Sequence, residues 1–563
     1  MVVVVALVLA AFAVRLVWIQ GIAGPAIAAD ALESRLTTVS TLGRRGQITD
    51  ANGVPLAVSV ERYDISVNQR TIAGYKGKDG VPNGAAGVAQ LLAPLLGTNA
   101  AELGGTLVGD STFRYVAKAV EPGLAREIRA LAINGVMIDK VADRLYPKGT
   151  LAGNVLGFVN SNGEGLQGLE YALDDQLAGA PGSRTYERGL GGQAIPGGFA
   201  AQTPAATGGT ARLTLLSDVQ WKAQQAADTY TAQTGASSIA IVVMDARTGA
   251  VYAVADSGSI DPNDPGVAGA GALSRAVSDV FEPGSTGKIV TLAAVLEEGL
   301  TSPTEHFEVP DRYETTNGAG TIKDSHDHGV LNLTTTGILA ESSNVGTVMV
   351  GLRLPVETRY EYLTRFGFGE LTGIEMPGES KGILRPVDQW DGRTRHNVLF
   401  GQGLSVNALQ AASVYATIAN GGVRVRPHVL AGWTSPDGAF TPAAPTTGEQ
   451  VVSPQTAATV LTMLESAVDE GTGGLAAIAG YRVAGKTGTA QEIGTGGITA
   501  SFVGVVPADD PRLVVGVFVR NPTSSIWGGS VAAPVFSEVA GFTLAELGVA
   551  PSGTAATLFP ATW

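Results

Sequence analysis

A serine and a lysine three positions apart, Ser285 and Lys288, are the first candidates for chemistry in this chain. Pro283-Gly284 interrupts the chain just before them, so the pattern predicts a helix N-terminus with both side chains on one face. A serine hydroxyl becomes a nucleophile when a base takes its proton, and a buried lysine in a cationic neighbourhood can be that base. Backbone N–H groups at a helix N-terminus can stabilise an oxyanion. Alone the pair is weak evidence, because a capping serine followed by an exposed lysine has the same pattern.

Two further motifs follow in order along the chain. Ser342-Ser343-Asn344 lies between two predicted helical runs, 334–340 and 345–354. Serine and asparagine are ordinary helix caps, and Ser-x-Asn also occurs at 66–68 and 405–407. Lys486-Thr487-Gly488-Thr489 lies on a predicted strand, where it would present a cation and a hydroxyl to a substrate carboxylate. Its glycine would allow another backbone to approach closely. A strand that simply leads into a glycine bend has the same sequence pattern.

Together the three motifs resemble the Ser-x-x-Lys, Ser-x-Asn and Lys-Thr-Gly set of penicillin-binding proteins and serine β-lactamases. Their longer contexts, residues 281–288, 341–346 and 484–490, are similar to the former. Residues 45–57 resemble the Arg-Gly-x-Ile-x-Asp-x-x-Gly-x-x-Leu-Ala signature of class B penicillin-binding proteins. Other segments resemble the pedestal domain of that class (144–147, 157–159 and 165–170) or its transpeptidase domain (401–403 and 418–422).

The resemblance implies a role for each motif residue in a D,D-transpeptidase. Ser285 attacks the penultimate D-Ala carbonyl of a peptidoglycan stem peptide, and Lys288 takes its proton. Ser342 and Asn344 relay protons and hold the substrate amide, while Lys486 and Thr487 bind the terminal carboxylate. Gly488 and Thr489 complete the substrate-binding strand, and the N–H groups of Ser285 and Thr489 form the oxyanion hole. No metal or organic cofactor is implied, and β-lactams are expected to acylate Ser285.

The resemblance also implies the architecture. We expect an α/β (α+β) multidomain protein with a penicillin-binding transpeptidase fold, an antiparallel sheet flanked by helices. The N-terminal part of the chain is expected to form an α+β pedestal and a single transmembrane helix. The expected domains are an anchor at 1–22, a dimerisation or pedestal domain at 23–205, a transpeptidase domain at 206–550 and a tail at 551–563. The 563 residues predict two to four domains at about 100–200 residues each.

Local patterns predict individual elements. Asn52-Gly53 predicts a hairpin turn, and the Gly-, Ala- and Pro-rich segment 191–210 an exposed connection. Helices are expected at 30–42 and 286–298, and a strand followed by a helix at 211–235. Strands are expected at 239–245, 250–255, 481–484, 501–506 and 513–519.

The N-terminus is predicted to be a membrane anchor. Residues 2–14 are wholly apolar, and Arg15 is the one charge among the first 29 residues. A helix over residues 1–19 would be about 28 Å long, close to the thickness of the hydrocarbon core. The alternative is a signal peptide cleaved near Ala26-Ile27-Ala28. We favour a retained single-pass anchor with an extracytoplasmic catalytic domain.

Composition excludes several other functions. The net charge of −14 and the lack of a basic cluster argue against nucleic acid as a partner. The chain has no cysteine, which excludes disulfides, thiolate catalysis and zinc-thiolate sites. His326-Asp327-His328 with Asp324 is a candidate metal set, but a polar loop bordering the active site is the favoured reading. Asp509-Asp510-Pro511 is read as a solvated turn rather than a catalytic pair.

Two rival functions remain at this stage. A hydrolase, either a β-lactamase or a D,D-carboxypeptidase, would share the three motifs, but the class B-like N-terminal half argues against it. A non-catalytic cell-wall scaffold would be free to lose Ser285, Lys288 and Lys486. Within class B we favour a role in septal synthesis over elongation. That role implies partners at the membrane, a polytopic glycosyltransferase and other cell-wall complex proteins.

Overall fold

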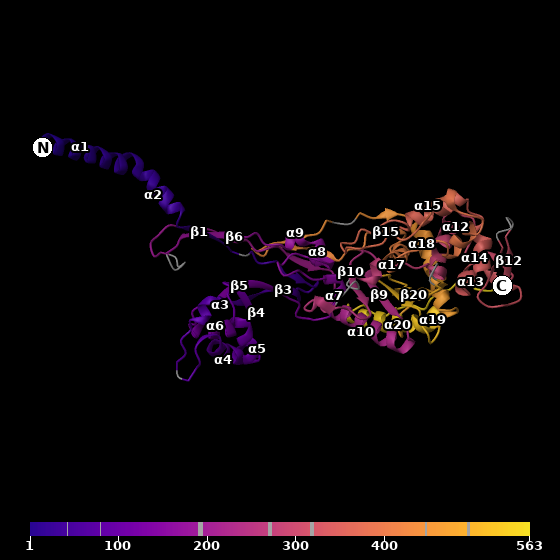
Figure 1. Cartoon of the computed structure of the whole chain (residues 1–563). Coiled ribbons are helices and arrows are strands. Elements are labelled where there is room, and N and C mark those ends of the chain that lie inside the picture. The colour runs from indigo at the N-terminus through magenta and orange to yellow at the C-terminus, as the bar shows by residue number, and fades with distance from the viewer. Residues whose placement is uncertain are drawn as a thin grey trace. The chain divides into compact units, whose positions relative to one another are not determined.

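The computed structural model describes residues 1–41, 43–78, 80–189, 195–267, 273–315, 320–444, 447–491 and 496–563 (Figure 1). The chain forms two compact units, each assembled from separate segments. The first comprises Met1–Gly46, Ser59–Asp143 and Gln176–Gly209, and the second comprises Gln47–Val58, Arg144–Asp175 and Thr210–Trp563. The functional domain boundaries expected at 22, 205 and 550 stay predictions.

The first unit opens with one long apolar helical segment. It consists of α1 (Val2–Val17), the π-helical turn η1 (Trp18–Ala23) and α2 (Gly24–Glu33). This segment is long and apolar enough to cross a membrane, and its most apolar stretch is fully exposed, as expected for an anchor. The Arg15 guanidinium lies 4.9 Å from the centre of the Trp18 ring. The segment is therefore a candidate membrane anchor.

The helix expected at 30–42 is wrong beyond Glu33. Residues Leu36–Thr41 form the strand β1, which pairs antiparallel with β6 (Gly182–Glu187), and β6 pairs in turn with β7 (Ala200–Thr203). Four of the six residues of β1 are β-branched, a composition that favours an extended backbone. Part of the predicted connection at 191–210 is therefore a strand, which is exposed along its length, while residues 190–194 lie outside the described residues.

The rest of the first unit is a small α+β layer. Its strands are β3 (Pro55–Val67), whose start belongs to the second unit, β4 (Arg114–Val120) and β5 (Val136–Leu145). Four helices pack near them: α3 (Gln69–Ala73), α4 (Gly84–Leu96), α5 (Ala100–Leu107) and α6 (Pro122–Ala130). Ile65, Val67, Leu92 and Ile128 are among the apolar side chains that form the core.

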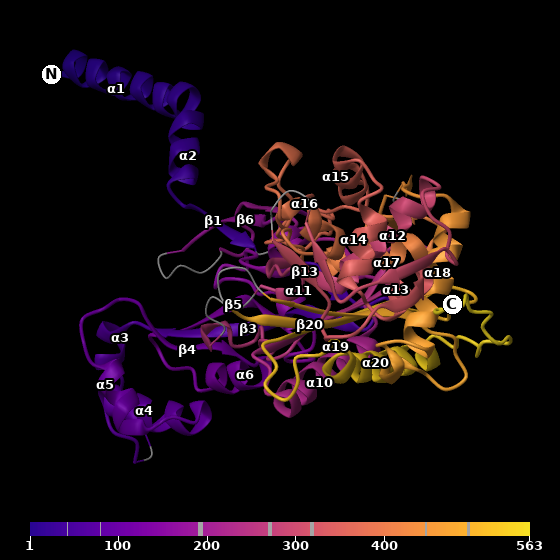
Figure 2. The same cartoon turned by 90° about the vertical axis from the view of Figure 1, so that its right-hand side faces the viewer.

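The second unit is built on a five-stranded antiparallel sheet in the order β10-β9-β21-β20-β19. The strands are β9 (Ser238–Asp245), β10 (Val251–Asp256), β19 (Ala484–Gln491), β20 (Ile498–Val506) and β21 (Leu513–Arg520). Val515, Val517 and Val519 face the core shared with α10 (Ser217–Thr234) and α20 (Ala533–Glu546). The alternate residue Gly516 faces Ala412 on α17 (Ala408–Ala419), so helices cover both faces (Figure 2). The predicted antiparallel sheet flanked by helices is confirmed.

The remaining elements of the second unit surround this sheet. The helices are α7 (Gly153–Leu156), α8 (Gly168–Ala172), α9 (Asp174–Leu177), α11 (Arg275–Ser278), α12 (Lys288–Glu297), α13 (Thr335–Ala340), α14 (Asn344–Gly351), α15 (Val356–Arg365), α16 (Thr394–Asn397), α18 (Pro454–Asp469) and α19 (Gly528–Val531), α9 continuing into the first unit. The short strands are β2 (Ile48–Thr49), β8 (Thr210–Leu213), β11 (His306–Val309), β12 (Arg312–Glu314), β13 (Thr321–Lys323), β14 (Leu331–Thr334), β15 (Val423–Arg424), β16 (Leu430–Thr434), β17 (Phe440–Pro442) and β18 (Glu449–Gln450).

Most local predictions in this unit agree with the structure. The Asn52-Gly53 turn joins β2 to β3, with Gly53 at φ +82°, and the carboxylate of Asp50 accepts the N–H groups of Asn52 and Val54. The strand expected at 481–484 is displaced, since β19 begins at Ala484. Tyr481 donates its hydroxyl to Val549 O and Arg482 pairs with Glu465, and both contacts hold these residues away from the sheet.

Two segments singled out in the N-terminal half meet around a buried ion pair. Arg144 Nε lies 2.7 Å from Glu170 Oε1, and the Tyr146 hydroxyl donates to the same oxygen at 3.3 Å. The two charged side chains are 3% and 0% exposed. Gly157 and Gly168 stand so close that a Cβ on Gly168 would meet Gly157 N at 2.4 Å. The ion pair is therefore almost completely buried.

Glu170→Gln should lower the free energy of unfolding by about 3 kcal/mol, because a buried arginine loses its counter-charge. Chemical denaturation of the full chain measures this loss. Glu449→Gln is the matched control, since Glu449 pairs with Arg424 at 3.2 Å while 57% exposed. Its effect should stay within about 1 kcal/mol. Equal effects of the two substitutions would contradict a stabilising role for the buried pair.

Candidate active site

Ser285 lies on a short 3₁₀ turn rather than on the α-helix itself. The turn η4 (Gly284–Gly287) runs directly into α12, so the helix predicted at 286–298 is present with a tighter first turn. In a 3₁₀ turn residues i and i+3 eclipse one another, which aligns Ser285 with Lys288. Gly284, at φ +53°, donates its N–H to Gly401 O at 2.8 Å. A Cβ on Gly401 would stand 2.1 Å from Gly284 O, so only glycine permits this support of the turn.

Lys288 is fully buried beneath the nucleophile turn. Its Nζ donates to the backbone oxygen of Ser342 and, at 3.3 Å, to Ser342 Oγ. Burial, followed by the charge of Lys486, holds the pKa of Lys288 well below its usual range, and the charge of Asp324 opposes this only in part. A lowered pKa favours the free amine over the ammonium group, and the free amine is the form that can accept a proton.

Ser342 occupies a strained corner between two helices. Its φ of +61° lies in the left-handed region, which serine adopts rarely. The helix α13 ends just before it and α14 begins just after it, as the sequence predicted. Ser343 caps α14 by accepting the N–H of Gly346 at 2.8 Å, and Asn344 Nδ2 donates to Lys323 O at 3.2 Å. The corner therefore directs Ser342 toward Lys288 while its two neighbours fix the backbone.

The third motif lies on β19, the edge strand of the central sheet. Lys486 is fully buried, and its Nζ lies 3.3 Å from Thr487 Oγ1 and 3.5 Å from Thr472 Oγ1. Burial lowers the pKa of Lys486 to about 7, although Glu341 acts in the opposite direction. Neither Lys486 nor Lys288 forms a salt bridge with a carboxylate in the described part of the chain. An anionic ligand would therefore find a cationic site without a competing internal counter-ion.

A cleft of about 500 Å³ opens between these elements. Ser285, Ser342, Asn344, Thr487 and Thr489 line it, with both lysines buried in the structure around it. Gly488 faces the nucleophile turn, since a Cβ there would lie 2.9 Å from Thr286 Cγ2. The fold thus brings together all eight residues that sequence reasoning selected, although they span some 200 positions of the chain.

Other residues of the cleft were not anticipated. Thr472 lies 2.7 Å from Thr487, joining hydroxyl to hydroxyl, and Trp527 contributes an aromatic wall near His326, with ring centres 5.2 Å apart. Gly528 packs against Ser501 O, where a Cβ would stand at 2.2 Å. No spacing pattern marked these positions. The Trp-Gly-Gly run at 527–529 was the one available signal.

The loop at 324–328 borders the cleft, as favoured from the sequence. Ser325 and His326 line the cleft, while His328 contacts Asp324. Within the residues that the structure describes, no group of three or more histidine, aspartate or glutamate side chains is arranged to hold a metal ion. The polar groups of this loop serve other contacts, described below.

Comparisons with known proteins give one consistent likeness. Residues 239–541 match the family model of the penicillin-binding protein transpeptidase domain, and residues 40–210 match that of the penicillin-binding protein dimerisation domain. The chain is 38% identical to penicillin-binding protein PbpB of Mycolicibacterium smegmatis over 572 residues, covering 94% of this chain and 87% of that protein. It is 33% identical to peptidoglycan D,D-transpeptidase FtsI of Escherichia coli, covering 95% and 89%.

A solved structure shows the same likeness. Penicillin-binding protein 3 of Mycobacterium tuberculosis, complexed with aztreonam, superposes with a TM-score of 0.72 at 34% identity. The alignment covers 93% of this chain and all of that one.

Gly488→Ala should slow labelling by fluorescent penicillin about a hundredfold. The added Cβ would lie 2.4 Å from Ser501 Oγ and 3.1 Å from Pro283 O, so β19 must move away from the nucleophile turn. A displacement near 1 Å at reacting groups costs about this factor. Gly105→Ala is the control, because nothing lies within 4 Å of a Cβ there. Unchanged labelling by the Gly488 variant would show that this close approach does not matter.

Proposed function

The chain belongs to the penicillin-binding proteins that join a dimerisation domain to a transpeptidase domain, and we propose that it cross-links peptidoglycan stem peptides through an acyl-enzyme on Ser285. The observation that carries the proposal is the pair of buried lysines placed around one cleft with a serine on a tight turn between them. One lysine is suited to take a proton and the other to attract an anion.

The first half of the reaction forms an ester and releases D-Ala. Ser285 Oγ attacks the carbonyl carbon of the penultimate D-Ala while Lys288 Nζ takes the hydroxyl proton. The N–H groups of Ser285 and Thr489 stabilise the oxyanion of the tetrahedral intermediate. The peptide C–N bond then breaks, and the departing D-Ala nitrogen receives a proton from Lys288 by way of Ser342 Oγ, 3.3 Å from Nζ.

The second half transfers the acyl group. An amine of a neighbouring stem attacks the ester carbonyl, its proton passes to Lys288, and the C–O bond breaks as Ser285 Oγ regains a proton. Asn344 holds the substrate amide from the cleft wall. A β-lactam follows the first half alone, since its leaving group stays attached to the acyl chain.

Lys486 and Thr487 are proposed to bind the terminal carboxylate. A lysine whose pKa lies at about 7 is partly neutral in the free protein, and an anion beside it favours the charged form. Binding of the carboxylate therefore brings a proton onto Lys486. The resulting cation in turn keeps Lys288 neutral, because like charges at short range disfavour one another.

The two rival functions, a hydrolase and a non-catalytic scaffold, explain these features less well than a transpeptidase does. The dimerisation-domain match and the long apolar N-terminal segment are features that the hydrolase reading does not require. A non-catalytic scaffold would have no need to bury two lysines without carboxylate partners, an arrangement that costs stability. We also propose that the N-terminal helix anchors the protein in the membrane and that the catalytic unit lies outside the cytoplasm. There it would act beside a polytopic membrane glycosyltransferase.

Labelled penicillin should mark the purified protein, and Ser285→Ala should abolish the label, because Ser285 is the hydroxyl on the turn that leads into Lys288, whereas the Ser342 hydroxyl is proposed to relay protons. The adduct should persist for many minutes, whereas a hydrolase would release it. Ser405→Ala is the matched control, since Ser405 also begins a Ser-x-Asn triplet but does not line the cleft. It should keep the label. Equal labelling of the Ser285 variant and the parent protein would refute the assignment.

A division role predicts that the tagged protein gathers in a septal band in growing cells. Likeness to PbpB and FtsI supports this choice over elongation. Time-lapse imaging beside a membrane dye measures the distribution. The Ser285→Ala variant should still reach the septum if recruitment depends on regions other than the cleft. A uniform lateral or polar signal would instead favour elongation.

A further inference from the structure

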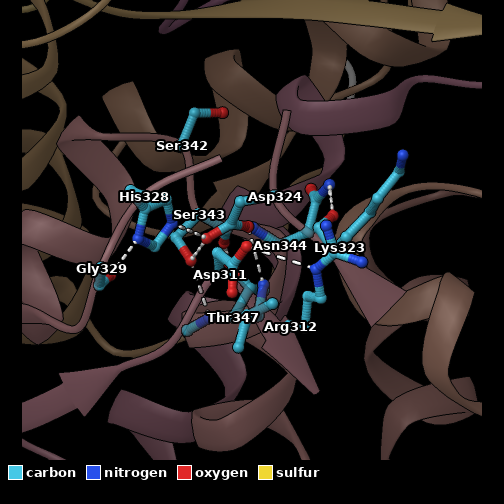
Figure 3. A network of polar contacts seen from close by, with 12 residues as sticks. Asp311, Arg312, Lys323, Asp324, His328, Gly329, Ser342, Ser343, Asn344 and Thr347 are labelled. Carbon is cyan, nitrogen blue, oxygen red and sulfur yellow. Dashed lines mark hydrogen bonds and ion pairs between the residues drawn. The ribbon is translucent and has the colours of Figure 1, made fainter. Parts of the chain in front are cut away.

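Asp324, in the loop between β13 and β14, is the centre of a polar network beside the catalytic corner (Figure 3). Its Oδ1 accepts the N–H groups of Asn344 at 2.5 Å and Val345 at 3.0 Å. Its Oδ2 accepts the Ser343 hydroxyl at 2.6 Å and lies 3.1 Å from His328 Nε2. The carboxylate is 7% exposed, so these four groups supply most of its surroundings.

The Asp324 carboxylate accepts hydrogen bonds from the three residues that follow Ser342, namely Ser343, Asn344 and Val345. The carboxylate stands at the N-terminus of α14, where unpaired N–H groups and the helix dipole favour negative charge. No dashed contact joins the Ser342 side chain to the network (Figure 3). Its hydroxyl lies instead 3.3 Å from Lys288 Nζ. A serine at φ +61° is strained and persists only where the structure around it enforces this conformation. On its other side Ser342 is tied to α13, because its N–H donates to Leu339 O at 3.1 Å.

His328 is placed so that both of its ring nitrogens face acceptors. Nε2 faces the Asp324 carboxylate, and Nδ1 lies 2.5 Å from the backbone oxygen of Gly329. A neutral imidazole carries one N–H, so one of the two contacts would set a lone pair against an oxygen. The imidazolium satisfies both. The geometry of the loop is therefore that of protonated His328.

We propose that Asp324 and His328 are positioning residues that hold the strained Ser342 corner in its reactive geometry. We call this pair, with the hydrogen bonds that Asp324 accepts from Ser343, Asn344 and Val345, the clamp, and it is complete only when His328 is protonated. This rests on the proposed function, because it assigns the clamp to the proton relay between Lys288 and the leaving group. Neither residue lines the cleft, so both act through Ser343, Asn344 and the loop backbone rather than on the substrate.

Several charged groups set the pH range of the clamp. Burial alone would lower the pKa of His328, but the Gly329 and Asp324 contacts, helped by the charge of Asp311 beside β12, raise it. Arg312 on β12 is paired with Asp311 and Asp327, and Lys288 on α12 feels the Asp324 charge from the cleft side. The folded pKa of His328 lies above the ordinary value of about 6.5. The clamp is therefore complete below that value and loosens as the pH rises through the folded pKa.

The test compares the second-order acylation rate constants of the full-length parent and His328→Gln across about pH 5.5 to 8.5 with fluorescent penicillin. Glutamine carries no positive charge at any pH, and its single amide nitrogen cannot place an N–H at both ring-nitrogen positions. The ratio of parent to variant should be about tenfold at the acid end and approach one at the alkaline end. Titration of Lys486, which also falls in this range, affects both proteins and cancels in the ratio.

His428→Gln is the matched control, since the imidazole of His428 lies 3.3 Å from a nearby backbone oxygen, Arg426 O, forms an ion pair with no carboxylate in the described part of the chain, and does not line the cleft. Its ratio should stay near one at every pH. Asp324→Asn should slow acylation, because the amide loses the charge that holds His328. Adding His328→Gln to that variant should then have no pH-dependent effect.

Saturation kinetics separate positioning from general instability. The acylation step should slow while the dissociation constant of the initial complex and the melting temperature change little. A pH-independent ratio, or a loss confined to melting temperature, would overturn the clamp. Such a result leaves the proposed function intact, because penicillin labelling would still depend on Ser285. Labelling that does not need Ser285 would instead overturn the function.

Discussion

The arrangement of the catalytic unit depends on two lysines that are buried around one cleft without carboxylate partners among the described residues. Removing an ammonium group from water costs several kcal/mol, and two such groups near each other also repel. The structure relieves this strain by allowing Lys288 to lose its proton, since burial and the charge of Lys486 act in the same direction. The same strain leaves Lys486 ready to be paired by an incoming anion. The proposed roles of Lys288 as a base and of Lys486 in binding an anion thus both follow from one unfavourable interaction.

Close backbone contacts keep that interaction in place. Lys288 begins the helix after the nucleophile turn, and Lys486 lies on the edge strand of the sheet, so only tertiary packing brings them together. Glycine occupies the points of nearest approach: Gly401 against Gly284, Gly488 against the turn, and Gly528 against Ser501. A side chain at any of these positions would force the strand, the turn or the wall apart. The glycines are therefore as necessary to the site as the charged residues whose distances they set.

The fold class and the eight motif residues could be expected from the sequence because the three motifs and their contexts resemble those of a known family, and because several strands leave local signals. The apolar runs of β9, β20 and β21 and the order of the three motifs can be read from neighbouring positions. Sequence reasoning failed where long-range contacts decide. Residues 36–41 were read as helix, yet pairing with β6 makes them a strand, and the tethered side chains of Tyr481 and Arg482 delay the start of β19. Trp527 and Thr472 reach the cleft only through the folded chain.

Asp324 shows most clearly what folding adds to the sequence, because the sequence favoured a polar loop beside the active site, and only the folded chain brings this carboxylate to the N-terminus of α14. A carboxylate this near the catalytic corner tends to keep Lys288 protonated, which would remove the base. The four donors around Asp324 offset that tendency, since an anion that is already hydrogen-bonded at both oxygens has its charge compensated locally. The network can then hold the backbone beside Ser342 while burial and Lys486 still dominate the pKa of Lys288. A negative charge is compatible with this site only where its hydrogen-bond capacity is already filled.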